Sequence, residues 1–392
     1  MVKRKSSLLD TFLALVQVAS PSLRERDVAK ILARRLRELG YEPLEDDVGQ
    51  VIGGNCGNLI VKVPATGAGP NLLLSAHIDT VEKPNDPPAL PHIEGKVVRR
   101  TGGGILGADD KAGVAVLVEL LSRLKTDKRK HGELLFVFSV AEELECLGAA
   151  ELDKTLYQKL EGGVILDYAL PTEIVIAAPT KVSFKITVHG STGHAAVPER
   201  KINALQVLAR VVADLPMGRL DAYTTANAGI MRSGNAINII PGKAYAEYEI
   251  RSHRKDILDF HVKQVVGIIE GVVRKSRVFG LAGAGGGLAG AGDKDEIIRA
   301  SVDVEVEVGY EGFRLAEDAK LVRTVQRAAQ KAGLTPELII AQGGSDANIY
   351  NRRGLPSLVV GCGMHEAHGS REYADLGEMQ KAVELLDCLV HR

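Results

Sequence analysis

The residues of this chain that could carry out chemistry are histidines and carboxylates, most of which directly follow an apolar run. They are His77, Asp79, Asp109, Glu142, Glu143, Asp167 and His368. Imidazole nitrogens and carboxylate oxygens are ligands with which proteins hold divalent metal ions. A site built from these groups can hold two such ions beside one water molecule, which becomes the nucleophile. The chain is therefore predicted to be a hydrolase.

The apolar runs explain how these residues could meet. Four short runs are continuously apolar, as expected for strands in a sheet that helices cover on both faces: 72–74, 134–140, 164–166 and 358–360. All the candidates except Asp109 follow one of these runs, at the end of the strands where α/β proteins form sites. Asp109 precedes a helix expected over 112–124, whose amino-terminal dipole favours a carboxylate. So many like charges in one crevice would repel each other unless metal ions neutralised them.

The pattern of the chain changes after about residue 179. Apolar residues at 182, 184, 186 and 188 alternate with polar ones, which is typical of a half-exposed antiparallel strand. A helix (203–215), two strands (224–231 and 244–251), a helix (256–275) and a strand (302–308) follow. This β-α-β-β-α-β order predicts a ferredoxin-like α+β domain over 179–313. It is inserted in a larger α/β domain, 1–178 and 314–392, whose mixed sheet lies between helices.

Further helices are expected at both ends of the larger domain. Ser22 and Glu25 have the spacing of a capping box at the start of a helix that runs to Leu39 and ends at Gly40. A second helix is expected near 317–332. The glycine-rich stretch Gly280–Gly292 lacks the strand and the Gly-Lys-Ser/Thr ending of a phosphate loop, which favours a surface loop.

The composition excludes several classes of partner. Lys plus Arg (49) and Asp plus Glu (50) nearly cancel and Trp is absent, so neither a nucleic-acid-binding stripe nor a stacking platform is indicated. No apolar run approaches the length of a membrane span. Asp10 interrupts the apolar stretch near the start, which argues against a cleaved signal peptide. Four scattered cysteines are typical of reduced thiols in a cytoplasmic protein.

Seven motifs, spread over about residues 8 to 390, resemble one family in their order and residue types. The chain resembles the peptidase T-like branch of the superfamily of co-catalytic zinc peptidases, which includes carboxypeptidase G, aminoacylase and succinyl-diaminopimelate desuccinylase. The motifs are Ser75-Ala76-His77-Ile78-Asp79-Thr80, Gly107-Ala108-Asp109-Asp110-Lys111-Ala112-Gly113, Ala141-Glu142-Glu143, Gly193-His194, Asn238-Ile239-Ile240-Pro241-Gly242, Gly343-Gly344-Ser345-Asp346 and His368-Gly369-Ser370.

The resemblance implies a role for each residue of the metal site. Asp109 would bridge two metal ions and precede a cis peptide bond. His77 and Asp167 would complete the first ion, and Glu143 and His368 the second. His365 competes with His368 for the last position, but the following Gly-Ser and Glu372 favour His368. Asp79 would orient His77, and Glu142 would be the general base. Zinc is the favoured metal, with cobalt or manganese as alternatives.

The resemblance also implies which residues face the substrate. His194 would donate a hydrogen bond to the developing oxyanion, often from a neighbouring subunit in dimeric relatives. Relatives include monomers and dimers, and by analogy we expect a homodimer formed through the inserted lid domain. Arg251 and Asn238 would hold the substrate carboxylate, although a salt bridge of Arg251 with Glu249 or Glu247 is an alternative. The backbone amides of three further residues would line the pocket floor: Gly343, Gly344 and Ser345.

These roles predict an aminotripeptidase-like exopeptidase of short peptides, with a metal-bridging hydroxide as the nucleophile. A carboxypeptidase or an N-acyl-amino-acid amidohydrolase would use the same mechanism on another substrate. A non-catalytic metal- or peptide-binding protein is a more distant alternative, against which Glu142 and all five metal ligands argue. Glu145 and Tyr168 stand where relatives usually carry glycine and could narrow the pocket.

Overall fold

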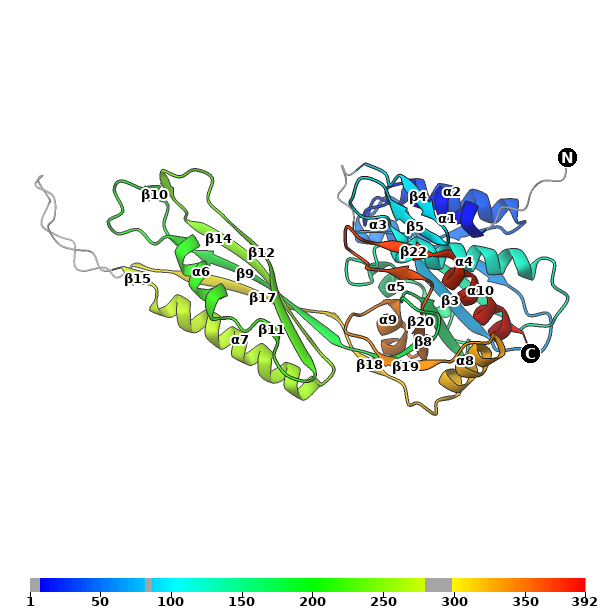
Figure 1. Cartoon of the computed structure of the whole chain (residues 1–392). Helices are drawn as coiled ribbons and strands as arrows, with labels where there is room; N and C mark the ends of the chain where they lie inside the picture. The colour runs from blue at the N-terminus through cyan, green and yellow to red at the C-terminus, as the bar shows by residue number, and fades with distance from the viewer. Residues whose placement is uncertain (1–7, 82–86, 279–297, 392) are drawn as a thin grey trace, which may run out of the picture. The chain divides into compact units, whose positions relative to one another are not determined.

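The structure, a computed structural model, describes residues 8–81, 87–278 and 298–391. The chain divides into two compact units, which are treated separately (Figure 1). Unit 1 comprises Met1–Ala178 and Phe313–Arg392, and unit 2 comprises Pro179–Gly312. The glycine-rich stretch Gly280–Gly292 and the basic start of the chain lie outside the described residues. Among the described residues, no helix is long and apolar enough to cross a membrane.

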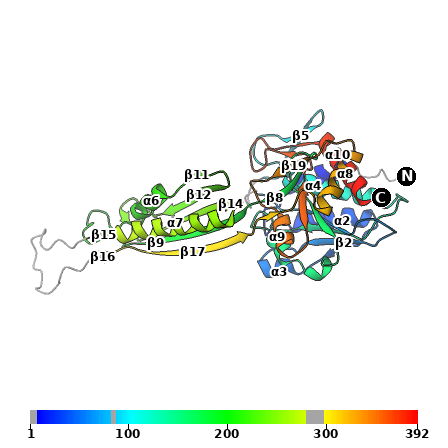
Figure 2. The same ribbon diagram turned by 90° about the horizontal axis from the view of Figure 1, so that it is seen from below.

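Unit 1 is built on a mixed nine-stranded sheet with helices on both faces (Figures 1 and 2). Eight strands follow one another in spatial order: β1 (Leu44–Glu45), β2 (Leu59–Val63), β6 (Leu134–Ser139), β3 (Leu72–His77), β7 (Gly162–Leu166), β20 (Ser357–Val360), β8 (Glu173–Ala178) and β18 (Phe313–Arg314). The ninth strand, β19 (Glu337–Ile340), also pairs with β8. A small sheet contains β21 (Met364–His365), β22 (Tyr373–Asp375), β5 (Val97–Arg100) and β4 (Pro91–Glu94). The predicted mixed sheet between helices is confirmed.

The central strands are buried on both faces, as their continuous apolar sequence predicts. Every residue of β3, β6 and β7 is buried. The helix α4 packs on β3, and α9 packs on β7 and β20. The helices of unit 1 are α1 (Leu8–Val16), α2 (Arg26–Glu38), α3 (Val48–Ile52), α4 (Ala108–Leu124), α5 (Leu147–Glu151), α8 (Lys320–Lys331), α9 (Asp346–Arg352) and α10 (Leu376–Val390), with a short 3₁₀ helix at Lys154–Leu156.

The start of α2 differs from the prediction. The helix begins at Arg26, and neither Ser22 nor Glu25 caps it through its side chain. Glu25 instead accepts hydrogen bonds from the amides of Leu23 and Ala141, and Ser22 donates to Asp79. The predicted capping box is therefore wrong, because Ser22 bonds to Asp79 and Glu25 bonds to Ala141, both far along the chain.

Unit 2 is a five-stranded antiparallel sheet with two helices on one face. Its strands, in spatial order, are β11 (Gly218–Arg219), β12 (Thr224–Ser233), β14 (Lys243–Ser252), β9 (Thr180–His189) and β17 (Ser301–Tyr310). The helices are α6 (Ala204–Asp214) and α7 (Lys255–Lys275), and two small ribbons pair β10 (Gly193–His194) with β13 (Ile239–Ile240) and β15 (Arg277–Val278) with β16 (Ile298–Arg299).

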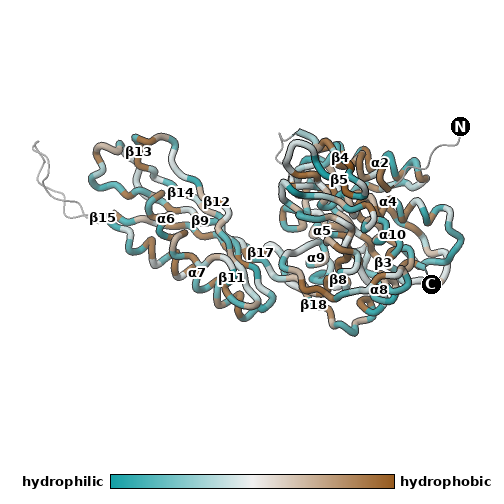
Figure 3. Tube along the Cα trace, in the orientation of Figure 1, coloured by the Kyte–Doolittle hydropathy of each residue, from teal (hydrophilic) through white to brown (hydrophobic). Residues whose placement is uncertain are grey.

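The two helices of unit 2 cover a single apolar face of its sheet. Buried residues of β9, such as Phe184 and Ile186, share one cluster with α6 and α7. The other residues of β9 and β14 are partly exposed and polar, as the predicted alternation requires. Figure 3 shows apolar and polar residues alternating along α7, whose apolar side faces this cluster.

Candidate metal centre

The candidate ligands come together at one edge of the sheet in unit 1. β3 runs parallel to both β6 and β7, so the carboxyl ends of these strands lie side by side. His77 is the last residue of β3, Glu142 and Glu143 follow β6, and Asp167 follows β7 directly. His368 lies in the loop between β21 and β22. This is the edge at which α/β sheets form their sites.

Asp109 lies between the two histidines. Its Oδ1 atom is 3.0 Å from Nε2 of His77, and its Oδ2 atom is 3.2 Å from Nε2 of His368. His368 Nε2 also lies 2.8 Å from Oε1 of Glu143. Among the groups whose ligand atoms lie within 4.8 Å of one another, two contain Asp109: His77, Asp109 and Asp167, and Asp109, Glu143 and His368. A third group in the same site joins His77, Glu142 and Glu143. The first two groups share Asp109, and each of its oxygens faces a different histidine.

The backbone of the loop that carries Asp109 is held by the side chain of Glu372. The peptide bond between Asp109 and Asp110 is cis, as the resemblance implied. The buried carboxylate of Glu372 accepts hydrogen bonds from the amides of Leu106, Gly107 and Asp109, at 2.6, 2.9 and 3.0 Å. In the sequence, Glu372 served only to favour His368 over His365, and the structure shows that its carboxylate holds the backbone of this loop.

Asp79 connects His77 with the loop after β6. Its Oδ1 lies 3.3 Å from Nδ1 of His77, and the carbonyl oxygen of Asp79 lies 3.0 Å from the same nitrogen. The amides of Glu142 and Glu143 donate to its two carboxylate oxygens, at 3.0 and 3.1 Å. With Nδ1–H as the donor, His77 presents the lone pair of Nε2 to the site, which is the tautomer that a metal ligand requires.

The electrostatics of the site point to a bound cation. Burial raises the pKa values of Glu142 and Asp167 well above their usual range, and neighbouring carboxylates act in the same direction. Burial opposes ionisation of Asp109 too, but hydrogen bonds with His368 and His77 keep its pKa below the usual value. Several buried carboxylates can be ionised together only if positive charge compensates them. The donor atoms and their spacing therefore fit divalent metal ions.

Glu142 has buried neighbours that the sequence did not single out. The Cys146 thiol donates to Oε1 of Glu142 at 3.4 Å. Asp346 accepts a hydrogen bond from Ser139 at 2.6 Å, and its ligand atoms lie within 4.8 Å of those of Glu142 and Cys146. Cys146 lies four residues after Glu142, and Asp346 ends a motif already quoted for the resemblance. Both residues could be seen in the sequence, but neither a cysteine nor an aspartate at these positions predicts a contact with Glu142. All four cysteines of the chain are free.

The competing histidine, His365, has other partners. Its Nε2 lies 2.5 Å from Glu378, and its ring stacks on Tyr373 with a centroid distance of 4.6 Å. It belongs to neither of the two groups that contain Asp109. The geometry therefore favours His368 over His365 as the late ligand.

Three of the proposed substrate-facing residues lie in unit 2, and the structure does not bring them all together. His194 pairs with Ile239, and the carbonyl of Asn238 accepts a hydrogen bond from Ala195 at 2.9 Å, so His194 and Asn238 are close. Arg251 lies near the other end of β14, opposite Lys181. There it forms a two-pronged ion pair with Glu249, at 3.0 and 3.2 Å, which is the alternative that the sequence left open.

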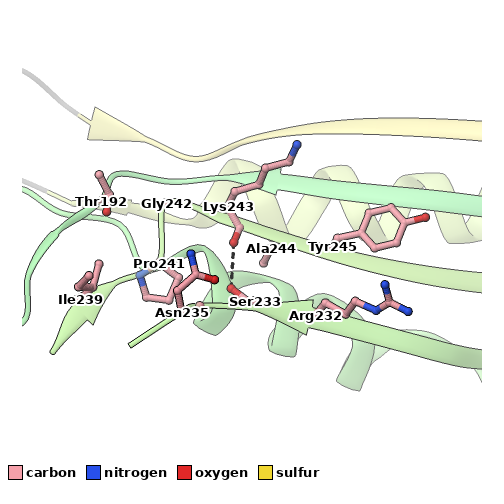
Figure 4. Close-up of a pocket in the computed structure, with 11 residues that line it drawn as sticks. Thr192, Arg232, Ser233, Asn235, Ile239, Pro241, Gly242, Lys243, Ala244 and Tyr245 are labelled. Atoms are coloured by element: carbon pink, nitrogen blue, oxygen red, sulfur yellow. Dashed lines mark hydrogen bonds between the residues drawn. The ribbon is translucent and has the colours of Figure 1, made fainter. Parts of the chain in front are cut away.

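A cavity of about 420 Å³ lies in unit 2, where the ribbon residue Ile239, the partner of His194, meets the ends of β12 and β14 (Figure 4). Thr192, Asn235, Ile239 and Pro241 surround one end of it, and Ser233 donates a hydrogen bond to the Lys243 carbonyl. In the figure the Lys243 side chain points away from these residues. The cavity marks the end of unit 2 at which His194 and Asn238 are exposed.

The glycine-rich loop before α9 has a structural role at its end. Ser345 caps α9, its amide donates to the Asn348 side chain at 3.1 Å, and its hydroxyl accepts from Ala347. The Ser345 amide is therefore committed to the helix start, which argues against its proposed contact with substrate. Gly343 and Gly344 precede it and are partly exposed.

The two departures from the family pattern have local consequences. Glu145 has a φ of +67°, a conformation that favours glycine, the residue that the resemblance leads us to expect at this position. The carbonyl of Tyr168 accepts a hydrogen bond from the amide of Cys362, so its backbone is held beside Asp167. Both positions lie within two residues of a candidate ligand, Glu143 or Asp167.

The sequence of the chain is similar to a known peptidase family and to a protein of Bacillus subtilis. The model of peptidase family M20/M25/M40 matches residues 73–392. The Bacillus subtilis (strain 168) protein YqjE is 31% identical over 391 residues, which cover 100% of this chain and 99% of YqjE.

Two solved structures resemble the whole chain. The aminopeptidase PepT from Bacillus cereus ATCC 10987 is 32% identical with a TM-score of 0.78, covering 99% of this chain and 98% of that one. A tripeptidase from Staphylococcus aureus subsp. aureus Mu50 is 29% identical with a TM-score of 0.83 and the same coverage.

Proposed function

The chain belongs to peptidase family M20/M25/M40, and from this premise we propose that it is a co-catalytic two-metal aminopeptidase of short peptides. A metal-dependent exopeptidase of short peptides follows from the family and from the two similar structures. The number and kind of metal ions, the roles of individual residues and the bond that is cleaved are the proposal. Unit 1 would be the catalytic domain, and unit 2 the lid and dimerisation domain.

The observation that carries the proposal is the pair of ligand groups that share Asp109. His77 and Asp167 would complete one ion, Glu143 and His368 the other, and Asp109 would bridge them. Mixed imidazole and carboxylate ligands suit zinc, with cobalt and manganese as alternatives. When bound, two such ions supply the Lewis acidity that activates water and polarises the scissile carbonyl.

The protein groups then have distinct tasks. Glu142 is a carboxyl group directly beside the proposed ligand Glu143, a position from which it can take a proton from water and return it to the leaving amine. Asp79 fixes the His77 tautomer. His194 would donate to the oxyanion that develops on the carbonyl, a contribution of roughly 3–4 kcal/mol in comparable sites.

The geometry of unit 2 supports a site that two copies of the chain complete. Arg251 lies eight residue steps along β14 from Lys243, which is at the His194 end, and this corresponds to about 26 Å at about 3.3 Å per residue. A fully extended tripeptide spans only about 10 Å. One unit 2 therefore cannot present His194 and Arg251 to the same short peptide. We propose that one copy supplies Arg251 and the other supplies His194 with Asn238.

Two features of unit 2 suit such a homodimer. The side chains of Val197, Ile237 and Ile239 are exposed around His194 and Asn238. An exposed cluster of apolar side chains favours a surface that another protein chain covers. Within the described residues, β17 is an edge strand that pairs only with β9. Its residues Val306 and Val308 are 43% and 55% exposed. A long edge strand with exposed valines is a template for pairing with another chain.

Subunit complementation tests the two-copy site. We expect His194→Ala and Arg251→Ala each to lose most activity, and a mixture after subunit exchange to recover it. In a mixed dimer one site receives both intact residues and the other neither, so random exchange should restore roughly a quarter of wild-type activity. No recovery, in mixtures shown to contain mixed dimers, would mean that both residues act from one chain.

A substrate panel tests the reaction itself. Free tripeptides, N-blocked dipeptides and N-acyl amino acids would be compared with the metal-loaded protein. We expect tripeptides with a free amino terminus to be hydrolysed fastest, with release of the first residue. Faster cleavage of blocked substrates would favour a carboxypeptidase or an N-acyl-amino-acid amidohydrolase, for which Arg251 would bind the same carboxylate. No turnover of any member would favour a non-catalytic protein.

A further inference from the structure

A short segment near the start of the chain packs against the metal centre of unit 1. It comprises residues 20–25 and lies before residue 73, where the match to the family model begins. Pro21 and Thr80 form a parallel bridge, and the amide of Thr80 donates to the carbonyl of Ser20 at 2.9 Å. The segment therefore runs beside the His77–Thr80 strand end. We refer to residues 20–25 as the amino-terminal brace.

Ser22 of the brace contacts the residue that orients His77. Its hydroxyl donates to Oδ2 of Asp79 at 2.7 Å. The same oxygen accepts the amide of Glu143 at 3.1 Å, and Oδ1 accepts the amide of Glu142 and faces His77. The Asp79 carboxylate is fully buried and has four donors, of which Ser22 supplies the only side-chain hydroxyl among those described.

A second residue of the brace holds the loop that carries the catalytic base. Oε1 of Glu25 accepts the amide of Ala141 at 3.0 Å and the amide of Leu23 at 2.8 Å. Ala141 immediately precedes Glu142, and its φ of +51° marks a sharp turn of the backbone. The brace thus contacts both loops that must stay in register for the metal centre: the one after β3 and the one after β6.

We propose that Ser22 is a positioning residue of the metal centre, acting through Asp79 on His77. This inference rests on the proposed function, because it assumes that His77 is a metal ligand. The hydroxyl of Ser22 fixes the plane of the Asp79 carboxylate, so that Oδ1 remains directed at Nδ1 of His77. Without it, Oδ2 keeps only the Glu143 amide and the carboxylate can rotate away from the imidazole. His77 then loses the partner that fixes its tautomer and ring orientation.

The consequence is a change in metal affinity that a general loss of stability would not produce. Removing a hydrogen-bond partner of a ligand typically lowers metal affinity 10–100-fold. Ser22 acts one contact further out, so we expect Ser22→Ala to weaken zinc binding about tenfold, at the lower end of that range. The effect should concern the site of His77 and leave the affinity of the second ion nearly unchanged.

The experiment compares full-length variants after metal removal. Zinc dissociation constants would be measured for both ions by competition with a chelator, and cobalt-loaded protein would report ligand geometry through its visible absorption. Ser22→Thr, which keeps the hydroxyl, should restore both properties. The matched control is Ser122→Ala, because Ser122 is a buried serine on α4. Thermal unfolding of the metal-free proteins would show how much stability each change costs.

The outcomes separate this inference from the proposed function. Failure of the wild-type protein to bind two ions would overturn the proposed function itself. If wild-type protein binds two ions and Ser22→Ala matches it in affinity and cobalt spectrum, the positioning role is wrong. The same holds if Ser122→Ala weakens zinc as much, or if Ser22→Thr fails to rescue. Should Ser22→Ala not fold, Ser22→Cys, a weaker donor, should give an intermediate affinity, and wild-type affinity in that variant would also overturn the role.

Discussion

The two units of this chain treat charged side chains in opposite ways. In unit 1, Asp79, Asp109 and Asp110 are buried, and the imidazole of His77 contacts the first two of them. In unit 2, the ion pair Lys185–Glu307 and the contact between His189 and Asp303 lie on the open face of the sheet, at 3.0 and 2.8 Å. Buried carboxylates are expensive unless compensated, whereas exposed pairs cost and contribute little. The difference indicates that unit 1 is built to hold cations.

Metal removal should separate the two units most clearly. Chelation is expected to abolish turnover and to lower the stability of unit 1, because binding at 100 times Kd contributes about 2.7 kcal/mol. Hydrogen exchange would show the change: amides near His77, Asp109 and Glu142 should lose protection, and those of α6 and α7 should not. Equal loss in both units, or none, would remove the contrast.

Loss of the base should be the next largest effect. Glu142→Gln keeps the size of the side chain but cannot accept a proton, so kcat should fall by about 10²–10⁴-fold. Metal content should stay at the wild-type value, because the five proposed ligands do not include Glu142. Glu151→Gln, an exposed glutamate of α5, is the control and should be unchanged. Near-normal turnover in Glu142→Gln would reject the assigned base.

A functional charge of unit 2 should show a smaller, substrate-dependent effect. Arg251→Met should raise KM for peptides with a free carboxyl terminus, because a hydrogen bond to a charged group contributes roughly 1.5–3 kcal/mol. Peptides amidated at that end should be affected much less. The control is Arg254→Met, because Arg254 is exposed and paired with Asp256. The same loss for both kinds of peptide would show that Arg251 only supports the fold through Glu249.

The smallest effect is expected for the exposed pairs of unit 2. A double-mutant cycle with Lys185→Met and Glu307→Gln should give a coupling energy below about 1 kcal/mol, because both side chains are solvated. Denaturant unfolding measures the coupling, and turnover should not change. A coupling of several kcal/mol would mean that this face is covered, for example by another copy of the chain.

The sequence predicted the metal-site cluster because the signal is local. His77, Glu142 and Asp167 each end or follow a short apolar run, and parallel neighbours necessarily bring such ends together. The mixed sheet and its helices followed from the same runs. The alternation in β9 and the cis peptide after Asp109 are likewise present in the structure.

Other features could not be predicted because they depend on contacts between distant parts of the chain. Ser22 and Glu25 have capping-box spacing, but their partners are Asp79 and Ala141. The four valines at alternate positions of β17 predict one buried face, yet Val306 and Val308 are exposed, whereas Val302 and Val304 pack against the core of unit 2. Local pattern specifies the element, and only packing decides which of its residues are covered.

The central claim is that Asp109 bridges two metal ions. A crystal structure of the zinc-loaded protein, with anomalous scattering recorded at the zinc edge, tests it most directly. We predict two peaks flanking the Asp109 carboxylate, one within bonding distance of His77 and Asp167 and the other of Glu143 and His368. A single peak, or peaks bound elsewhere while these side chains stay apart, would contradict the account.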